Sequence, residues 1–485
     1  QDPAGQDTKF VPWVSKILDV FAPIDPNGPP LPDLPPPTLN LSYNTPLQDA
    51  HEPPKNDIDQ RLLARSLFLR ERDSGEEDAY VMATVQSNER VVRAGVNTSE
   101  VRVIRVAVDE GVKYEAGDVL YLLPDQPSSR VHSLCRRLGV SRNTNVTFSR
   151  ANTSHEWNPR TVGLMDLIQS TLDVNSASAG RWFIELMAYY ATTTREADKL
   201  KYFCSREGSE ELYEYNKREK RTVLELLSEF PSVHLPLERF LESCPVLMPR
   251  AFSIACSPHT KIQTSDKPNP ALPHSRKTIE ICAKVVRSVT PWGRHREGLC
   301  TGWLRNVSVG TRVAVRVEKG KFKIPPNEQK PLILVGPGTG FAPVKSLVED
   351  RIANAKATGE WPPAPMAIFF GCRHRDKDYI YREEMEMWEN NGVFTRGGGI
   401  FRAFSRDQRE KRYVTDEIER QGALLWDMLE KGASIYVSGS AKSMPDDVFR
   451  SFRNVIATHG KKSLLEASRL LLSLEQKGRY VSETW

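Results

Sequence analysis

The 485-residue sequence has no apolar run long enough to cross a bilayer. Its longest runs, such as LILVG from Leu332, have the length of a strand, whereas a membrane helix needs about 20 apolar residues. The chain also lacks a dominant charge, because 67 Lys and Arg residues face 62 Asp and Glu residues. A net charge of +5 gives no reason to expect nucleic-acid or membrane binding by the chain as a whole.

Signals for export and for metal binding are also missing. The first residues, QDPAGQDTKF, contain no basic region followed by an apolar core, so we expect a cytoplasmic protein. They contain no initiator methionine either, and we expect the chain to be a fragment. The seven Cys residues are scattered and form no CxxC or Cys/His spacing, which predicts reduced thiols and no metal site.

Residues 1–78 are rich in proline. A short amphipathic segment, VPWVSKILDVF, is followed by the run APIDPNGPPLPDLPPPT. Proline fixes φ and removes a hydrogen-bond donor, so the pattern predicts an extended, poorly packed linker with one short helix.

The rest of the chain shows two kinds of periodicity. Within 79–330, Val-rich alternating segments such as VRVIRVAVD predict strands, while apolar residues three and four apart at about 129–245 predict helices. Over 331–485, apolar strands such as MAIFFG run into loops and helical stretches, which is typical of a parallel sheet. The predicted fold class is α/β plus β-barrel: an antiparallel barrel with a helical insertion, followed by a parallel α/β domain.

A glycine-rich turn follows the strand that ends at Val335. In VGPGTGFAP, Gly336, Gly338 and Gly340 allow close backbone approach to a pyrophosphate, and the helix that follows offers free N–H groups. Thr339 adds a hydroxyl. Taken alone, the motif is equally consistent with a tight turn.

A second motif, AFSRDQREKRYVTDE, collects groups suited to a phosphate. Ser405, Arg406, Lys411 and Tyr413 supply a hydroxyl, two cations and an aromatic ring within nine residues. Such a set fits the 2′-phosphate of NADPH. In isolation it also fits a solvated, charged helix start.

Two further motifs suit a flat, phosphate-bearing cofactor. In PRAFSIACSP, Arg250 can neutralise a phosphate, Phe252 can lie on a ring and Ser253 can hydrogen-bond its edge; the alternative is an ordinary strand. GLCTGWL, from Gly298, combines glycine with a helix start. The terminal Trp485 is either core cover or a lid on a flat cofactor.

Together and in this order, these motifs resemble the diflavin reductase family, over about residues 80–485. The resemblance implies a ferredoxin–NADP reductase-like fold, with FAD in the barrel and NADPH in the α/β domain. It also implies hydride transfer from NADPH to FAD. The FMN domain that such proteins carry is expected to be missing, because residues 1–78 are too few and too rich in proline to form it.

The resemblance carries roles over to matching positions. Those assigned to FAD are Lys220, Arg221, Arg250, Ala251, Phe252, Ser253, Gly298, Leu299, Cys300, Thr301 and Trp485. Those assigned to NADPH are Thr339, Ser405, Arg406, Lys411, Arg412, Tyr413, Val414, Thr415 and Asp447. Ser253, Glu483 and Trp485 are expected to assist hydride transfer, with Trp485 stacked on the flavin. The chain departs from the family pattern at Ser438, where Cys is frequent, and at Glu483, where Asp is common.

The ETW ending and the AKSMP run are similar to the branch of the family that serves cytosolic iron–sulfur protein assembly. This similarity implies two partners, the protein's own FMN domain and an iron–sulfur acceptor of the anamorsin type. Alternatives are the reductase half of a cytochrome P450, sulfite or methionine synthase reductase, or a stand-alone ferredoxin–NADP reductase-like enzyme, which usually lacks the helical insertion. A non-enzymatic scaffold with a decayed site is the remaining alternative.

Overall fold

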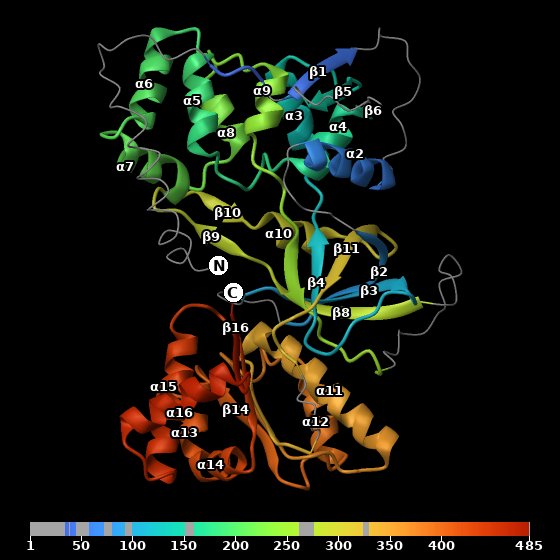
Figure 1. The fold of residues 1–485 in the computed structure, drawn as a ribbon, viewed down its shortest axis with the longest axis vertical. Coiled ribbons are helices and arrows are strands. Elements are labelled where there is room, and N and C mark those ends of the chain that lie inside the picture. The colour runs from blue at the N-terminus through green and yellow to red at the C-terminus, as the bar shows by residue number, and fades with distance from the viewer. Residues whose placement is uncertain are drawn as a thin grey trace.

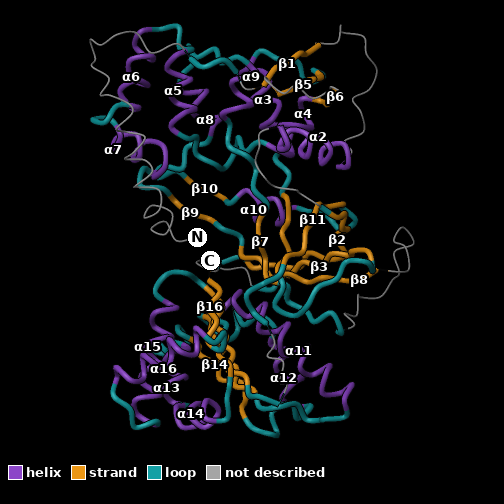
Figure 2. Tube along the Cα trace, viewed as in Figure 1, coloured by secondary structure: helices purple, strands orange, loops and turns teal. Residues whose placement is uncertain are grey.

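The computed structural model describes residues 34–37, 39–44, 58–71, 80–92, 99–150, 160–260, 276–323 and 329–484. Three units follow one another along the long axis of the molecule (Figure 1). A mainly helical unit lies at one end, an antiparallel barrel in the middle and an α/β unit at the other end (Figures 1 and 2). In this described part of the chain, no helix is long and apolar enough to cross a membrane.

The middle unit is a six-stranded antiparallel barrel. Its strands are β2 (Val81–Arg90), β3 (Val101–Asp109), β4 (Val119–Leu123), β7 (Arg250–Ser253), β8 (Arg276–Lys284) and β11 (Arg312–Glu318). They are ordered β7-β4-β11-β2-β3-β8, and a bridge between Ile254 and Ile281 joins the first strand to the last. Helix α10 (Leu299–Asn306) contributes Cys300 and Leu304 to the barrel core. The predicted barrel is therefore confirmed.

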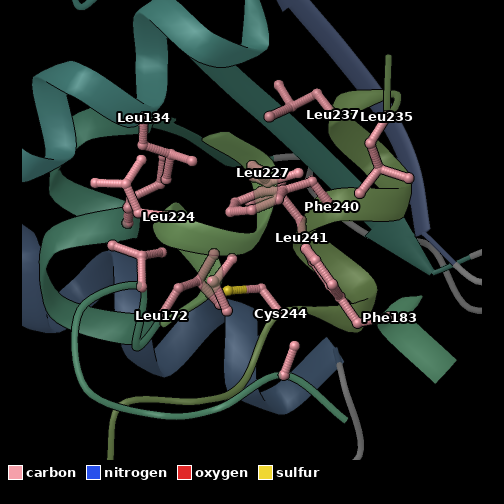
Figure 3. Close-up of a cluster of buried hydrophobic side chains, with 14 of the residues drawn as sticks. Leu134, Leu172, Phe183, Leu224, Leu227, Leu235, Leu237, Phe240, Leu241 and Cys244 are labelled. Carbon is pink, nitrogen blue, oxygen red and sulfur yellow. The ribbon is translucent and has the colours of Figure 1, made fainter. Parts of the chain in front are cut away.

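The helical insertion is also present. It comprises α3 (Ser128–Leu138), α4 (Leu164–Thr171), α5 (Arg181–Tyr189), α6 (Thr194–Cys204), α7 (Ser209–Leu212), the π-helix η1 (Tyr213–Arg218), α8 (Val223–Glu229) and α9 (Leu237–Ser243). Residues such as Leu134, Leu224 and Phe240 fill one shared core (Figure 3). Two strands that the sequence did not predict, β5 (Asn145–Arg150) and β6 (Arg160–Gly163), lie within it.

The prediction of a poorly packed linker over 1–78 is wrong for two stretches. Strand β1 (Leu39–Asn44) pairs antiparallel with β5, and helix α2 (Ile58–Glu71) buries Phe68 in the helical core. Arg65 of α2 donates to the carbonyls of Ser170 (3.1 Å) and Leu247 (2.9 Å). The prediction was wrong because it applied the proline-rich character of the preceding residues to a stretch that contains no proline. That stretch includes the helix-forming run LLARSLFL. The predicted short helix VPWVSKILDVF lies outside the described residues.

The C-terminal unit is a parallel α/β sheet, as predicted. Its strands are β12 (Leu332–Val335), β13 (Met366–Cys372), β14 (Gly398–Phe404), β15 (Ser434–Gly439) and β16 (Tyr480–Thr484), in the order β14-β13-β12-β15-β16. Helices α11 (Phe341–Thr358) and α12 (Arg382–Asn390) pack on one face. The other face is covered by α13 (Val414–Arg420), α14 (Gly422–Glu430), α15 (Met444–His459) and α16 (Leu464–Gln476). Strand order reverses at β12, and ligands of such sheets bind beyond the carboxyl ends of the strands at this point.

Candidate functional site

The glycine-rich turn lies at this reversal point. A short 3₁₀ turn, η2 (Gly338–Gly340), links β12 to α11. A Cβ atom on Gly340 would lie 2.3 Å from the carbonyl oxygen of Ser438, and one on Gly336 would lie 2.7 Å from the carbonyl oxygen of Gly340. Gly338 has a φ of +56°. These glycines let the loop press against β15, and the cradle at the start of α11 fits the pyrophosphate of a dinucleotide.

The phosphate-suited groups follow the edge strand β14. The N–H of Ser405 donates to the carbonyl of Cys372 (3.0 Å), and the N–H of Arg406 donates to the carbonyl of Arg373 (2.9 Å). These bonds hold the turn against the carboxyl end of β13. Lys411 is exposed, and its cation lies in the segment that leads into α13.

The remaining members of this motif begin α13. Tyr413 is the N-cap residue, half exposed, and its N–H donates to Asp416 (2.7 Å). Arg412 is exposed, with its Nε atom 3.7 Å from Glu417. Val414 is buried in the domain core, and Thr415 is half-buried. The side chains available to a ligand are therefore those of Ser405, Arg406, Lys411, Arg412 and Tyr413, whereas Val414 offers only its backbone.

Asp447, assigned to the nicotinamide half of the cofactor, lies in the first turn of α15. Its carboxylate pairs with Arg450 at 3.1 Å and is partly exposed. The ion pair is formed within one helix and uses one carboxylate oxygen, so the other oxygen remains able to accept a hydrogen bond from a ligand.

The barrel brings the two FAD motifs together. Arg250 opens β7, and Gly298 is the N-cap of α10, whose first-turn N–H groups have no side-chain cap. Burial raises the pKa of Cys300 to about 12, while the nearby charge of Arg250 opposes the rise. Cys300 is thus a buried thiol, and Arg250 lies close to the start of α10. Together they form a cationic, N–H-rich place suited to a pyrophosphate.

Other residues of these motifs have structural contacts. The hydroxyl of Thr301 accepts the N–H of Val286 (3.1 Å), so it ties α10 to the segment between β8 and β9. Leu299 is partly buried against the small cluster of Leu123, Leu247 and Ala314. Phe252 packs partly on the barrel core, whereas its neighbour Ala251 is exposed.

The two members of the basic pair differ. Lys220 is exposed, and its ammonium donates to Ser288 (3.1 Å). Arg221 is buried; its guanidinium donates to the carbonyl of Tyr215 (2.8 Å), pairs with Glu229 and lies 3.8 Å from the centre of the Tyr215 ring. Lys220 is therefore the member of the pair that a ligand can reach, whereas the guanidinium of Arg221 is already bound by residues of the helical unit.

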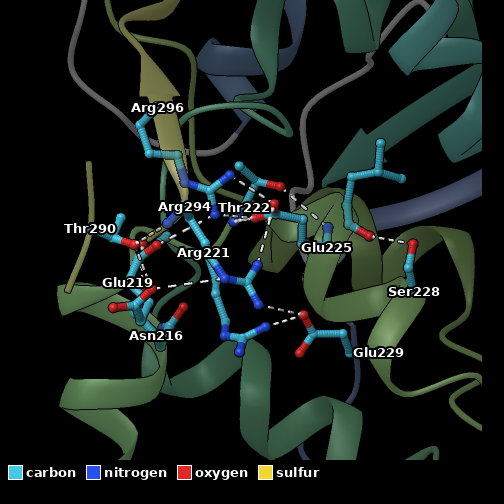
Figure 4. Close-up of polar contacts among 12 residues, drawn as sticks. Asn216, Glu219, Arg221, Thr222, Glu225, Ser228, Glu229, Thr290, Arg294 and Arg296 are labelled. Carbon is cyan, nitrogen blue, oxygen red and sulfur yellow. Dashed lines mark hydrogen bonds and ion pairs between the residues drawn. The ribbon is translucent and has the colours of Figure 1, made fainter. Parts of the chain in front are cut away.

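An ion-pair network around Arg221 joins the helical unit to the hairpin of β9 (Arg287–Val289) and β10 (His295–Glu297) (Figure 4). Arg296 makes two 2.8 Å hydrogen bonds to Glu225, and Thr290 donates to the buried Glu219 (2.6 Å). Sequence reasoning missed this network, since its residues come from two distant segments with no shared motif.

Two buried polar atoms without a hydrogen-bond partner lie at the ends of neighbouring strands. Ser438 of β15 is register partner to Glu483 of β16. Among the described residues, neither the hydroxyl of Ser438, which is 0% exposed, nor Oε2 of Glu483 has a hydrogen-bond partner. Burial raises the pKa of Glu483, which favours its protonated form. A ligand with amide or hydroxyl groups, such as a nicotinamide carboxamide, would satisfy both atoms.

Glu483 of this pair lies near the barrel. Burial and the charges of Glu318 and Glu483 raise the pKa of Tyr121 on β4, so Glu483 is within electrostatic reach of that strand. Strand β4 pairs with β7, with Val119 opposite Ser253. Glu483 therefore lies near β4, the strand beside the one that carries Ser253. Trp485 lies outside the described residues.

Three cations that influence one another were not singled out from the sequence. Partial burial, with the charges of Arg373 and Lys442, lowers the pKa of Lys284. The three residues come from the ends of β8 and β13 and from the segment before α15. The charges of Arg373 and Lys442 thus act on Lys284, and like charges that add in this way favour a phosphorylated ligand.

The barrel with its phosphate cradle, and the parallel sheet with its own cradle at the reversal point, define a flavin- and nicotinamide-dependent oxidoreductase of the ferredoxin–NADP reductase type. Residues 76–303 match the FAD binding domain family, and residues 334–449 match the oxidoreductase NAD-binding domain family. The cofactors of the chain are FAD and NADPH.

Similarity to individual proteins identifies the family more narrowly. NADPH-dependent diflavin oxidoreductase 1 of Arabidopsis thaliana is 35% identical over 509 residues, covering 100% of this chain and 78% of the relative. The protein of the same name from Xenopus laevis is 34% identical, covering 83% of this chain and 64% of the relative. The protein of the same name from Mus musculus is 30% identical, covering 100% of this chain and 78% of the relative. The chain belongs to the NADPH-dependent diflavin oxidoreductase family and spans part of the length of these relatives.

Proposed function

We propose that this chain transfers a hydride from NADPH to FAD, and that electrons then pass to an FMN domain and to an iron–sulfur protein. The observation that supports the proposal is that one chain carries two phosphate cradles, one at Arg250 and the start of α10 and one at the loop from Gly338 to Gly340, within regions that match FAD-binding and NAD-binding domains. Transfer between two bound cofactors requires their reacting atoms to be held at close range and in one orientation, and a chain that binds both cofactors can provide this.

The barrel residues would hold FAD. Arg250 and the first-turn N–H groups of α10 bind the pyrophosphate, Phe252 contacts the flat ring and Ser253 hydrogen-bonds the reacting edge. Lys220 adds a cation at the rim. Bound FAD supplies the redox chemistry, because it takes up two electrons as a hydride and can release them singly.

The α/β residues hold and orient NADPH. The loop from Gly336 to Gly340 binds the pyrophosphate, while Arg406 and Lys411 bind the 2′-phosphate with Ser405 and Tyr413. Ser438 and Glu483 orient the carboxamide of the nicotinamide. Asp447 contacts the nicotinamide half.

Trp485 is proposed to cover the flavin ring and to move aside when the nicotinamide enters. Remote binding of the 2′-phosphate drives this movement, so NADH, which lacks that group, displaces the indole poorly. Deletion of Trp485 should therefore raise the ratio of NADH to NADPH efficiency, measured with ferricyanide as acceptor. An unchanged ratio would show that Trp485 does not block the nicotinamide site.

The electron acceptor is proposed to be an anamorsin-type protein of cytosolic iron–sulfur assembly. The protein is proposed to act in the cytoplasm. The test is to fuse the chain to the FMN domain of one of its relatives and to follow NADPH-driven reduction of such an acceptor. The fusion should reduce it quickly, whereas the chain alone should reduce ferricyanide but not the acceptor. Equal rates with and without the FMN domain would refute the proposed electron path.

A further inference from the structure

The barrel strand that carries the FAD motif continues directly into contact with α11. The three residues after Ile254 are buried, and each is bound by a polar side chain of α11. The carbonyl of Ala255 accepts Lys345 Nζ (2.9 Å), the carbonyl of Cys256 accepts Ser346 Oγ (2.9 Å), and Ser257 Oγ donates to Asp350 (2.8 Å). The same helix begins at the NADPH phosphate loop. One strand and one helix thus connect the two cofactor motifs through this contact, which we call the interdomain latch.

Lys345 is the charged centre of the latch. Its side chain is 4% exposed, and its ammonium lies 3.2 Å from Glu280 of β8 and 2.6 Å from Glu349 of α11. Glu280 is also bound by Arg105 of β3 at 2.8 Å. Burial alone would lower the pKa of Lys345, but Glu280 and Glu349 outweigh burial and raise it. The ammonium is therefore charged at neutral pH.

A cation buried at this point of α11 is costly, because a buried charge is expensive unless it is paired. Leucine or methionine would fill the same space without that penalty. The ion pair with Glu280 crosses the boundary and, with the Glu349 pair on the same helix, compensates for this cost. The Glu280 pair forms only in one arrangement of the two units.

We propose that Lys345 is a positioning residue, which sets the distance between flavin and nicotinamide by locking α11 onto the strand after the FAD motif. This inference rests on the hydride transfer proposed above. Ser253 lies two residues before Ala255, and Gly340 lies five before Lys345, so movement at the latch moves both cofactor motifs relative to each other. Each cofactor is bound by its own unit. Loss of the latch should consequently affect the transfer rate far more than binding.

The experiment compares three variants of the flavin-loaded chain. Lys345→Met removes the cation, and the double variant K345M/E349Q also removes the charge of Glu349, while Glu280 keeps its partner Arg105, so that the double variant leaves no carboxylate of the pair without a cation. Lys356→Met is the matched control, because Lys356 is exposed on the same helix. The measurements are FAD content, affinity for 2′,5′-ADP, the long-wavelength charge-transfer band formed with NADP⁺ and the rate of flavin bleaching by NADPH.

The double variant should keep its FAD and its 2′,5′-ADP affinity within about twofold, while the charge-transfer band weakens. A displacement near 1 Å at a reacting centre costs on the order of a hundredfold, so bleaching should slow by roughly ten- to a hundredfold, and KM for NADPH should change little. Lys356→Met should match the parent. Unchanged bleaching in both Lys345 variants would overturn the inference, and so would parallel losses of FAD or 2′,5′-ADP binding. If the parent chain itself shows no bleaching, the proposed function fails instead.

Discussion

Gly340→Ala tests the phosphate loop most severely. The added Cβ would lie 2.3 Å from the carbonyl oxygen of Ser438 and 2.8 Å from its carbonyl carbon. Ordinary contact begins at 3.4 Å, so the loop or the end of β15 must move by about 1 Å. Both contacting atoms belong to the backbone of a central strand, which cannot rotate away as a side chain could.

Overpacking of this kind costs about 1–3 kcal/mol. For a unit of this size each kcal/mol lowers Tm by roughly 2–4 °C, so Tm of the α/β unit should fall by roughly 2–12 °C. The forced shift also moves the cradle away from the place where the pyrophosphate binds, and the Kd for NADP⁺ should rise at least tenfold.

The assay is calorimetry of the purified chain together with titration of NADP⁺. Gly111→Ala is the control, because a Cβ at Gly111 would meet nothing within 4 Å; it should change neither quantity. If Gly340→Ala binds NADP⁺ as tightly as the parent, the loop does not hold the pyrophosphate, and the assignment of the NADPH site is wrong.

Three further outcomes are expected. Arg250→Ala should release FAD on dialysis while the α/β unit stays folded; full retention of flavin would refute its role at the pyrophosphate. Alanine at Arg406 and at Lys411 should weaken NADPH binding roughly ten- to hundredfold per residue, since each charge-assisted bond contributes about 1.5–3 kcal/mol, with little effect on NADH; equal losses for both nucleotides would contradict 2′-phosphate recognition. Because burial raises the pKa of Glu483, ionisation there costs stability as pH rises through the folded pKa. Glu483→Gln should therefore raise Tm at neutral pH and leave it unchanged below the ordinary carboxyl pKa of 4.5; a Tm gain that is independent of pH would contradict this.

The architecture was predictable because periodicity records which faces are buried. The alternation of apolar and polar residues in VRVIRVAVD predicted a strand of the barrel. The apolar run LILVG predicted the central strand of the parallel sheet. The cofactor motifs were visible because each is a local run, such as Gly336–Gly340 or Ser405–Tyr413, whose residue types suit a phosphate.

Features made by distant segments were not predictable. Lys345 was an unremarked residue of a helix, and only the folded chain brings it to Glu280. Ser438 and Glu483 were noted as departures, but their register across β15 and β16 depends on strand pairing. The burial of α2 was not predicted because the proline-rich run before it led us to expect an extended linker there.

The central claim is that this chain moves a hydride from NADPH to its own FAD. Its most direct test is anaerobic rapid mixing of the flavin-loaded chain with NADPH, and with NADPH deuterated at C4, while the visible flavin absorbance is recorded. The account predicts bleaching in a single turnover that is slower with the deuterated nucleotide and much slower with NADH. A flavin-loaded chain that binds NADPH but is not bleached would contradict it.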